Sequence, residues 1–221
     1  MTETQHPLLI AHRAGNHLDA LAPAADAGAH LIEIDVWFHR GRLEVGHDKT
    51  LGPVPLRWDR WSLGLGWRRK VLLPEILSQL PPHIEPMFDL KGHHPGLPAA
   101  LLHAIEQHLP NRPYAVSSQT WAYLDHFLHD DHARVVRSVG STEALQLLRE
   151  DLDSWPGAGV GFQFKLLTPE VIAELRERTP LIVTWTINDL EQARTLIRQG
   201  VGGIITDNLD VIRALREPPA E

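Results

Sequence analysis

Short apolar runs alternate with amphipathic, helix-length stretches from one end of this 221-residue chain to the other. Each apolar run is bounded by polar or turn-forming residues, which is typical of buried strands. The expected strands are Leu8–Ala11, Leu31–Phe38, Ile84–Leu90, Tyr114–Ser117, Arg134–Ser138, Gly159–Phe164, Leu181–Thr186 and Gly203–Thr206. The expected helices are Asp19–Ala27, Leu73–Leu80, Leu97–Leu109, Thr120–Leu128, Thr142–Leu152, Pro169–Arg178, Leu190–Arg198 and Asp210–Leu215.

Strands that alternate with helices predict a parallel sheet covered by helices. Eight such units in a chain of this length predict an α/β fold, a single-domain (β/α)8 TIM barrel spanning residues 1–221. An open doubly wound sheet is the rival fold. Its phosphate-binding turn would read G-x-G-x-x-G after the first strand, whereas residues 12–17 read HRAGNH.

Two details modify this plan. The pair Arg40-Gly41 predicts a turn with a short returning strand at Leu43–Gly46, which gives a hairpin insertion after the second strand. Residues 217–221 contain Pro218-Pro219 and are expected to be a disordered tail. Ser141, Thr168 and the pair Asn188-Asp189 are expected to cap the helices that follow them.

Composition excludes several classes of function. The net charge is −7, which disfavours a protein that coats nucleic acid, because phosphate backbones require clustered cations. The chain contains no cysteine, so disulfides, thiolate catalysis and cysteine zinc sites are excluded. We find neither an apolar run of membrane-spanning length nor a secretory pattern, which favours a cytoplasmic protein without a transmembrane segment.

Polar residues gather where the expected strands end, which is where barrel enzymes place their chemistry. Glu33 and Asp35 lie two apart in the second strand and therefore share a face. Asp89 and Lys91 show the same spacing at the end of the third. Carboxylates side by side on a buried face repel one another unless a cation joins them.

These three carboxylates form an oxygen-only set suited to one divalent cation, Mg2+ or Ca2+. His12 and His47 flank the set and are candidates for general base and general acid. Arg13 and Lys91 supply positive charge for a phosphate. The combination indicates phosphoryl transfer on a small-molecule substrate.

Further candidates follow the later strands. Gln163 and Lys165 end the sixth expected strand and are candidates for substrate contact, and Trp185 lies in the seventh. Asp207 is interpreted mainly as a helix cap. The segment Arg57–Lys70 interleaves tryptophans with arginines, which indicates either a loop packed over the barrel mouth or a weak contact with lipid.

Taken in order, these pieces resemble the glycerophosphodiester phosphodiesterase family, in the superfamily of phosphatidylinositol phospholipase C-like phosphodiesterases. The matching segments are residues 10–13 (IAHR), 32–36 (IEIDV), 46–51 (GHDKTL), 73–77 (LPEIL), 88–91 (FDLK), 184–188 (TWTIN) and 200–207 (GVGGIITD). The resemblance implies a (β/α)8 barrel, catalytic roles for His12 and His47, metal ligation by Glu33, Asp35 and Asp89, and a phosphate-side lysine at position 91. It also implies that Trp185 is a wall of the substrate pocket.

The sequence also departs from the family pattern. Ala14 precedes Gly15 where the family has His-Arg-Gly, and the Pro-Glu-Asn-Thr motif is absent. The third metal ligand is usually glutamate, and an aspartate at position 89 resembles the related sphingomyelinase D-type phospholipases. Three functions therefore remain open: hydrolysis of a glycerophosphodiester to an alcohol and glycerol 3-phosphate, a phospholipase D-like reaction on lysophospholipids, and a non-catalytic barrel that binds a phosphorylated ligand. The sequence does not specify the oligomeric state.

Overall fold

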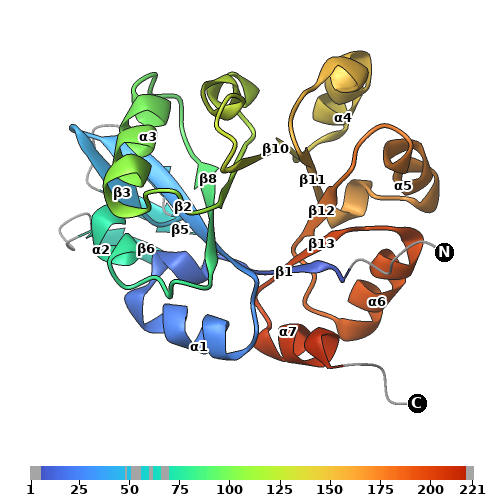
Figure 1. The fold of residues 1–221 in the computed structure, drawn as a ribbon, viewed down its shortest axis with the longest axis horizontal. Coiled ribbons are helices and arrows are strands. Elements are labelled where there is room, and N and C mark those ends of the chain that lie inside the picture. Colours follow the sequence, from blue (N-terminus) through green and yellow to red (C-terminus); the bar gives the residue numbers. More distant parts are fainter. Residues whose placement is uncertain (1–5, 48, 51–55, 60–61, 66–69, 218–221) are drawn as a thin grey trace.

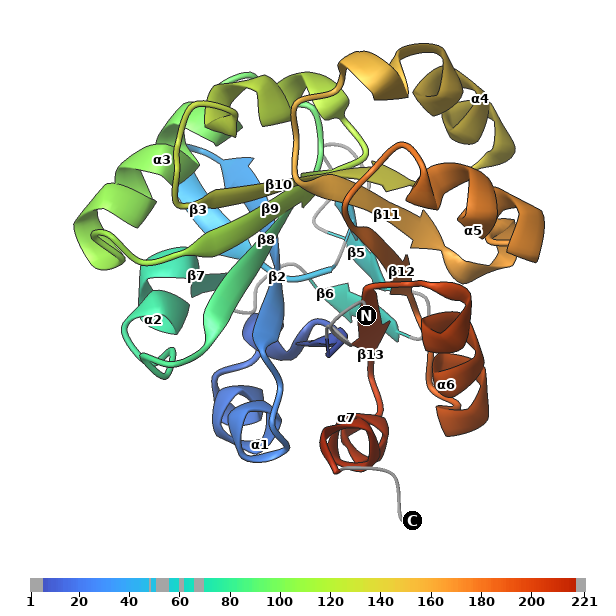
Figure 2. The same cartoon turned by 45° about the vertical axis from the view of Figure 1, so that its right-hand side comes forward.

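The chain folds into a ring of eight parallel strands surrounded by helices (Figures 1 and 2). The computed structural model describes residues 6–47, 49–50, 56–59, 62–65 and 70–217. The ring closes because β1 pairs with both β13 and β2. Its strands are β1 (Leu8–Ala11), β2 (Leu31–His39), β8 (Glu85–Leu90), β9 (Tyr114–Ser118), β10 (Ala133–Val139), β11 (Gly159–Gln163), β12 (Ile182–Trp185) and β13 (Gly203–Thr206). The predicted (β/α)8 barrel is confirmed.

Helices cover the outside of this ring (Figure 1). They are α1 (Leu21–Asp26), α2 (Leu73–Leu77), α3 (Leu97–His108), α4 (Thr142–Asp151), α5 (Pro169–Arg176), α6 (Leu190–Gln199) and α7 (Leu209–Arg216). Short 3-10 helices lie at η1 (Ala14–Asn16), η2 (Leu18–Ala20), η3 (Trp121–Phe127), η4 (Leu152–Ser154) and η5 (Phe164–Leu166). The Ser141, Thr168 and Asp189 side chains accept hydrogen bonds from the first turns of α4, α5 and α6, as predicted.

The segment Thr120–Leu128 differs from expectation, since it forms the 3-10 helix η3 where an α-helix was predicted. Two of its side chains are anchored to backbone carbonyls of neighbouring segments. Trp121 Nε1 donates to Ser138 O, and the Tyr123 hydroxyl lies 3.2 Å from His94 O. These tertiary contacts determine the 3-10 conformation of a short segment whose residue pattern alone predicts an α-helix.

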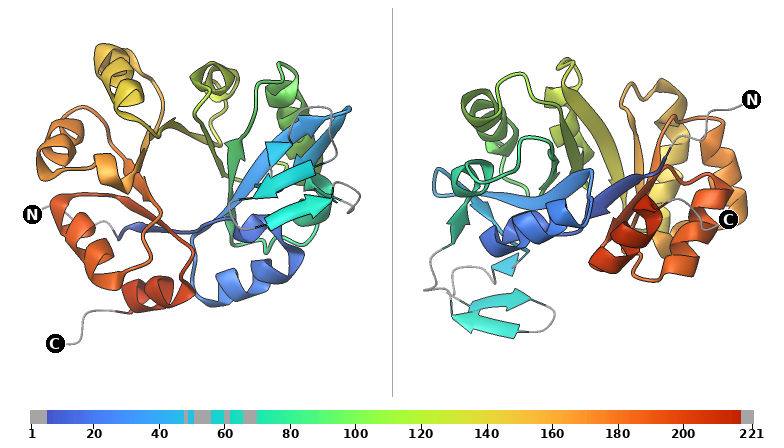
Figure 3. Two further views of the ribbon diagram at one scale, coloured as in Figure 1. Left: turned by 180° about the vertical axis from the view of Figure 1, so that it is seen from behind. Right: turned by 60° about the horizontal axis from the view of Figure 1, so that its bottom comes forward.

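The predicted hairpin after the second strand is present. β3 (Arg42–Val45) pairs antiparallel with β2 and with β7 (Val71–Leu72). β4 (Lys49–Thr50), β5 (Leu56–Asp59) and β6 (Ser62–Leu65) form a separate antiparallel sheet (Figure 3). Most of the predicted lipid-contact segment Arg57–Lys70, and the end of the 217–221 tail, lie outside the part of the chain whose side chains the structure describes.

Two apolar layers hold the barrel together. Outward residues of the strands pack under the helices; on β2 these are Ile32, Ile34 and Val36, all fully buried. A smaller cluster fills the barrel interior and consists of Ile10, Leu31, Met87, Ala115, Val183 and Ile205. This interior layer forms an apolar floor beneath the mouth of the barrel. Among the described helices, none has the length and apolar character that crossing a bilayer requires.

Candidate active site

Six strands each contribute one residue to the interior apolar cluster. On each of them, the residue two positions further along the chain lines a cavity at the carboxyl ends of the strands. Successive side chains alternate between the two faces of a strand, so a step of two keeps a residue inside the barrel and moves it toward the mouth. The six residues reached by this step are His12, Glu33, Asp89, Ser117, Trp185 and Asp207. The cavity has a volume of about 600 Å3. Its chemistry therefore begins one layer above the apolar floor.

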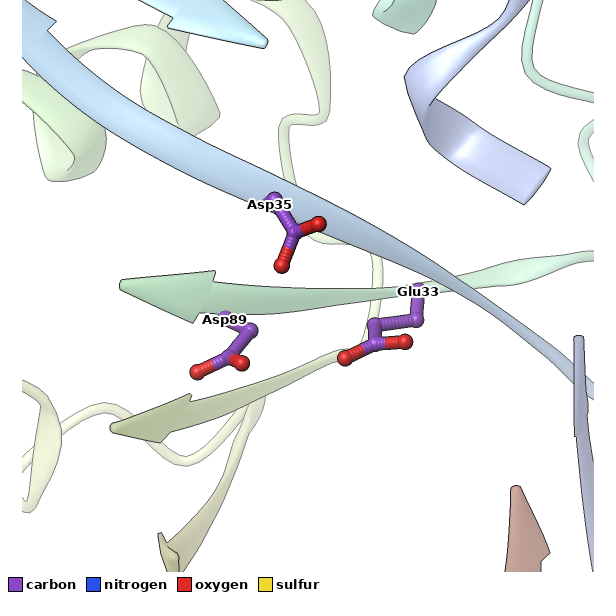
Figure 4. A group of neighbouring side chains, drawn as sticks. All are labelled: Glu33, Asp35 and Asp89. Carbon is purple, nitrogen blue, oxygen red and sulfur yellow. The ribbon is translucent and has the colours of Figure 1, made fainter. Parts of the chain in front are cut away.

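Glu33, Asp35 and Asp89 point toward one another in this mouth (Figure 4). Asp35 and Asp89 are direct partners in the register of β2 and β8, as their positions in sequence predicted. One oxygen from each carboxylate lies within 4.8 Å of those of the other two. Glu33 and Asp35 are buried and Asp89 is half-buried. The sequence prediction that these strands bring three carboxylates together is thus correct in geometry.

The three carboxylates carry more negative charge than the lysine beside them can balance. Lys91 Nζ lies 2.9 Å from Asp35 Oδ1 and also contacts Asp89 Oδ2. Burial acts together with the charges of Asp35 and Asp89 to raise the pKa of Glu33 to about 7, against the opposing effect of His12. Burial likewise acts to raise the pKa of Asp35, but the charge of Lys91 and the hydrogen bonds from Lys91 and Asn16 together outweigh burial, so the pKa is lowered. One lysine therefore does not neutralise three carboxylates.

Asn16 holds Asp35 in place from the loop after β1. Its Nδ2 donates to Asp35 Oδ2 at 2.7 Å, and its Oδ1 accepts from the Asp35 backbone N–H at 2.9 Å. The loop lies close against β2 because Gly15 has no side chain. A Cβ at Gly15 would lie 2.3 Å from Ile34 Cγ1 and 2.8 Å from Glu33 O. Asn16 and Gly15 were not identified as site residues from sequence, because their role depends on this contact with β2.

Arg13 adopts a left-handed backbone conformation with φ of 54°. Such a conformation costs a non-glycine residue about 1–2 kcal/mol and persists where surrounding contacts impose it. Here it directs the Arg13 backbone N–H to Glu33 Oε2 at 3.2 Å. The guanidinium Nε lies 3.7 Å from Asp35 Oδ2. Arg13 thus contacts two of the three carboxylates through different groups.

His12 is held by Asp207, which was interpreted from sequence as a helix cap. Its Nδ1 lies 2.6 Å from Asp207 Oδ1, and its Nε2 faces Glu33 Oε2 at 3.5 Å. Burial lowers the pKa of His12, but the hydrogen bond with Asp207 and the charge of Glu33 outweigh burial, so the pKa is raised. The cap of α7 is instead Asn208, whose side chain accepts from Asp210 N. The interpretation of Asp207 was wrong because residues 195 positions apart in sequence meet only when β1 and β13 pair.

Asn188 fixes Asp207 in turn. Its Oδ1 accepts from the Asp207 backbone N–H at 2.9 Å and from Thr206 Oγ1 at 3.0 Å. Its Nδ2 lies 3.3 Å from Asp207 Oδ2. This amide therefore links the ends of β12 and β13 and orients the carboxylate that meets His12.

His47 reaches the same cavity from the β2–β3 hairpin. The hairpin is fixed by a hydrogen bond from Gly46 N to Asp35 O at 3.1 Å. A second bond joins Trp37 Nε1 to Gly46 O at 2.8 Å. The charge of His47 acts to lower the pKa of Asp35, which places the imidazole within electrostatic range of the carboxylate cluster.

The remaining predicted residues, Gln163, Lys165 and Trp185, line the opposite part of the cavity. Gln163 and Trp185 are register partners on β11 and β12. Gly161 leaves room for the indole, since a Cβ there would lie 3.2 Å from Trp185 Cζ3. Gln119 and Ser138 also line this part and were not identified from sequence.

Comparison with known proteins agrees with this architecture. The sequence profile of the glycerophosphoryl diester phosphodiesterase family matches residues 85–211, more than half of the chain. A putative glycerophosphoryl diester phosphodiesterase from Silicibacter pomeroyi superposes with a TM-score of 0.76 at 19% identity, covering 96% of this chain and 93% of that one. A glycerophosphodiester phosphodiesterase from Thermotoga maritima gives 0.75 at 20% identity, with coverages of 96% and 99%.

An Oleispira antarctica phosphodiesterase, solved in complex with the product sn-glycerol-3-phosphate, gives a TM-score of 0.75 at 19% identity, with coverages of 95% and 96%. At such identities these structures show a shared fold. No curated protein sequence matches this chain significantly. The fold and the profile together define a phosphoric diester hydrolase. The chain belongs to the glycerophosphoryl diester phosphodiesterase family.

Proposed function

We propose that this protein hydrolyses a glycerophosphodiester to an alcohol and glycerol 3-phosphate in a reaction that depends on one divalent cation, Mg2+ or Ca2+. The observation that carries the proposal is a cavity lined by two histidines and by Glu33 and Asp89, which form a three-carboxylate cluster with the buried Asp35. The product bound to the similar Oleispira antarctica phosphodiesterase supports glycerol 3-phosphate as the product here.

The residues fit a hard divalent cation. Carboxylate oxygens are the ligands that Mg2+ and Ca2+ prefer. Asp35 Oδ1 is buried, and Lys91 Nζ at 2.9 Å is shared between it and Asp89 Oδ2, so one ammonium serves two carboxylates. Burial and the neighbouring Asp35 and Asp89 raise the pKa of Glu33, and a cation beside it would favour the ionised form. Glu33, Asp35 and Asp89 would hold the ion, which when bound supplies positive charge to a non-bridging phosphate oxygen.

The two histidines carry the proton transfers in this proposal. One accepts the proton of the attacking oxygen as that oxygen bonds to phosphorus. The other donates a proton to the leaving alcohol oxygen as its bond to phosphorus breaks. The attacking oxygen belongs either to water or to a neighbouring hydroxyl of the substrate, and the latter route passes through a cyclic phosphate. Arg13 and Lys91 stabilise the negative charge that develops on phosphate oxygens.

Alanine substitution of each histidine tests the proposal. His12→Ala and His47→Ala should each lower the release of glycerol 3-phosphate from glycerophosphocholine by about 10²- to 10⁴-fold. His126→Ala, an exposed histidine on η3, is the matched control and should retain normal turnover. Near-normal turnover by both cavity variants would contradict the proposal. A diester with a p-nitrophenyl leaving group, which departs without a proton, should rescue the variant that lacks the acid.

The alternative functions receive less support. A non-catalytic phosphate-binding barrel would not require His12 to be held by Asp207 beside the carboxylates. A phospholipase D-like reaction on lysophospholipids was suggested by Asp89 and by lipid contact through Arg57–Lys70, most of which lies outside the described residues. Lipid contact and a cytoplasmic location therefore remain predictions from the sequence.

A further inference from the structure

The cavity has two halves of different chemistry. β13, β1, β2 and β8 are consecutive in the ring and form the ionic half. Among the described residues, the carboxylates that line the cavity all belong to this half: Glu33, Asp89 and Asp207. β9, β10, β11 and β12 are also consecutive and form what we call the amide half (Figure 2). Its polar and aromatic lining residues include Gln119, Ser138, Gln163, Lys165 and Trp185.

Lys165 carries the charge of the amide half. It lies in η5, directly after β11, and its side chain is exposed at the cavity. Among the described residues it forms no ion pair, whereas Lys91 of the ionic half contacts two carboxylates. Within the described part of the chain its positive charge is therefore not paired with a carboxylate, and it acts on whatever occupies the amide half.

Two amides accompany this cation. The side chains of Gln119 and Gln163 make no hydrogen bonds within the described part of the chain. Gln119 lies over Gly140, where an added Cβ would come within 3.2 Å of its Nε2. Unpaired amides and an indole provide donors, acceptors and a flat wall, which suit the hydroxyl groups of a polyol.

We propose that the amide half binds the leaving alcohol of the substrate, and that Lys165 selects alcohols that bear hydroxyls and no positive charge over quaternary ammonium alcohols such as choline. The inference rests on the proposed function, because it assigns the scissile phosphate to the ionic half. A choline group would meet the Lys165 charge, and none of the described residues that line the amide half is a carboxylate that could offset it. Glycerol would meet hydrogen-bonding groups there without that repulsion.

Two substrates with the same glycerophosphate portion test this selection: glycerophosphoglycerol and glycerophosphocholine. The wild-type kcat/KM should favour glycerophosphoglycerol by about tenfold. Lys165→Met should bring this ratio close to one, mainly through KM, and Lys165→Glu should reverse it. Arg198→Met, which removes an exposed cation on α6 outside the cavity, is the matched control and should leave the ratio unchanged.

An unchanged ratio in Lys165→Met would overturn the inference. An equal fall for both substrates would also overturn it, because the glycerol portion rather than the leaving alcohol would then contact Lys165. Calorimetry on the His47→Ala protein, with and without Lys165→Met, gives the dissociation constants of both diesters. These constants test the selection by Lys165 independently of turnover. If the wild type hydrolyses neither diester, the proposed function fails. The selection by Lys165 is then still supported if His47→Ala binds glycerophosphoglycerol more tightly and Lys165→Met removes the difference, and it is overturned if the two constants are equal.

Discussion

Asp207 is the residue whose contribution is easiest to isolate. It accepts a hydrogen bond from His12 and is itself oriented by Asn188. An orienting carboxylate fixes the ring of its histidine and stabilises the imidazolium form. His12 therefore depends on a partner that it meets only through the pairing of the first and last strands of the barrel.

Asp207→Asn should lower kcat by about 10²-fold with a smaller effect on KM. Because Asp207 acts to raise the pKa of His12, the limb of the pH–rate profile that reports His12 should move to lower pH. A residue with a purely structural role would not shift that limb. Asp210→Asn on α7 is the control, since Asp210 pairs with Arg213 on the surface. Unchanged kcat and pH profile in Asp207→Asn would exclude this role.

At the level of elements, the strands and their polar ends were predictable, whereas the supports of the site were not. The step of two from Leu31 to Glu33 and from Met87 to Asp89 is visible in sequence, because strand periodicity alone determines which residues share a face. The contact of Asn16 with Asp35 depends on how closely a loop approaches β2. The 3-10 form of η3 similarly depends on anchors in other segments. Local patterns contain neither kind of information.

Gly15→Ala tests the packing of η1 against β2. The added carbon would overlap Ile34 and the Glu33 carbonyl, so the loop must move and Asn16 must shift from Asp35. Overpacking of this kind costs about 1–3 kcal/mol, measurable by urea unfolding, and metal affinity measured by calorimetry should fall as well. Gly96→Ala is the control, because its Cβ would meet only the side chains of His94 and Phe38, at 3.3 Å, and small movements of these side chains would accommodate it. Wild-type stability and metal affinity in Gly15→Ala would contradict this account.

For the whole molecule, the carboxylate cluster links stability to pH and to metal. Without a cation, the pKa of Glu33 is raised from 4.5 to about 7. The folded state then holds this proton more tightly than the unfolded state does. The stabilising effect of that proton is present at low pH and is lost as pH rises from 4.5 through 7. A cation that binds the ionised cluster removes this destabilisation.

The increase in Tm on adding Mg2+ or Ca2+ should therefore be larger at about pH 8 than at about pH 5.5, by roughly 5 °C. Differential scanning calorimetry with and without the ion measures it directly. Glu33→Gln carries no titrating group at this position and should lose most of the pH dependence. If the increase in Tm on adding the ion is equal at both pH values, or larger at the lower one, Glu33 does not couple metal binding to protonation.

The central claim is that the three-carboxylate cluster makes phosphodiester hydrolysis dependent on a divalent cation. 31P NMR of the purified protein with glycerophosphoglycerol tests it most directly, in three samples: with EDTA, with Mg2+ and with Ca2+. The account predicts that the diester signal persists in EDTA and is converted to glycerol 3-phosphate when an ion is restored. Conversion at the same rate in EDTA would contradict it.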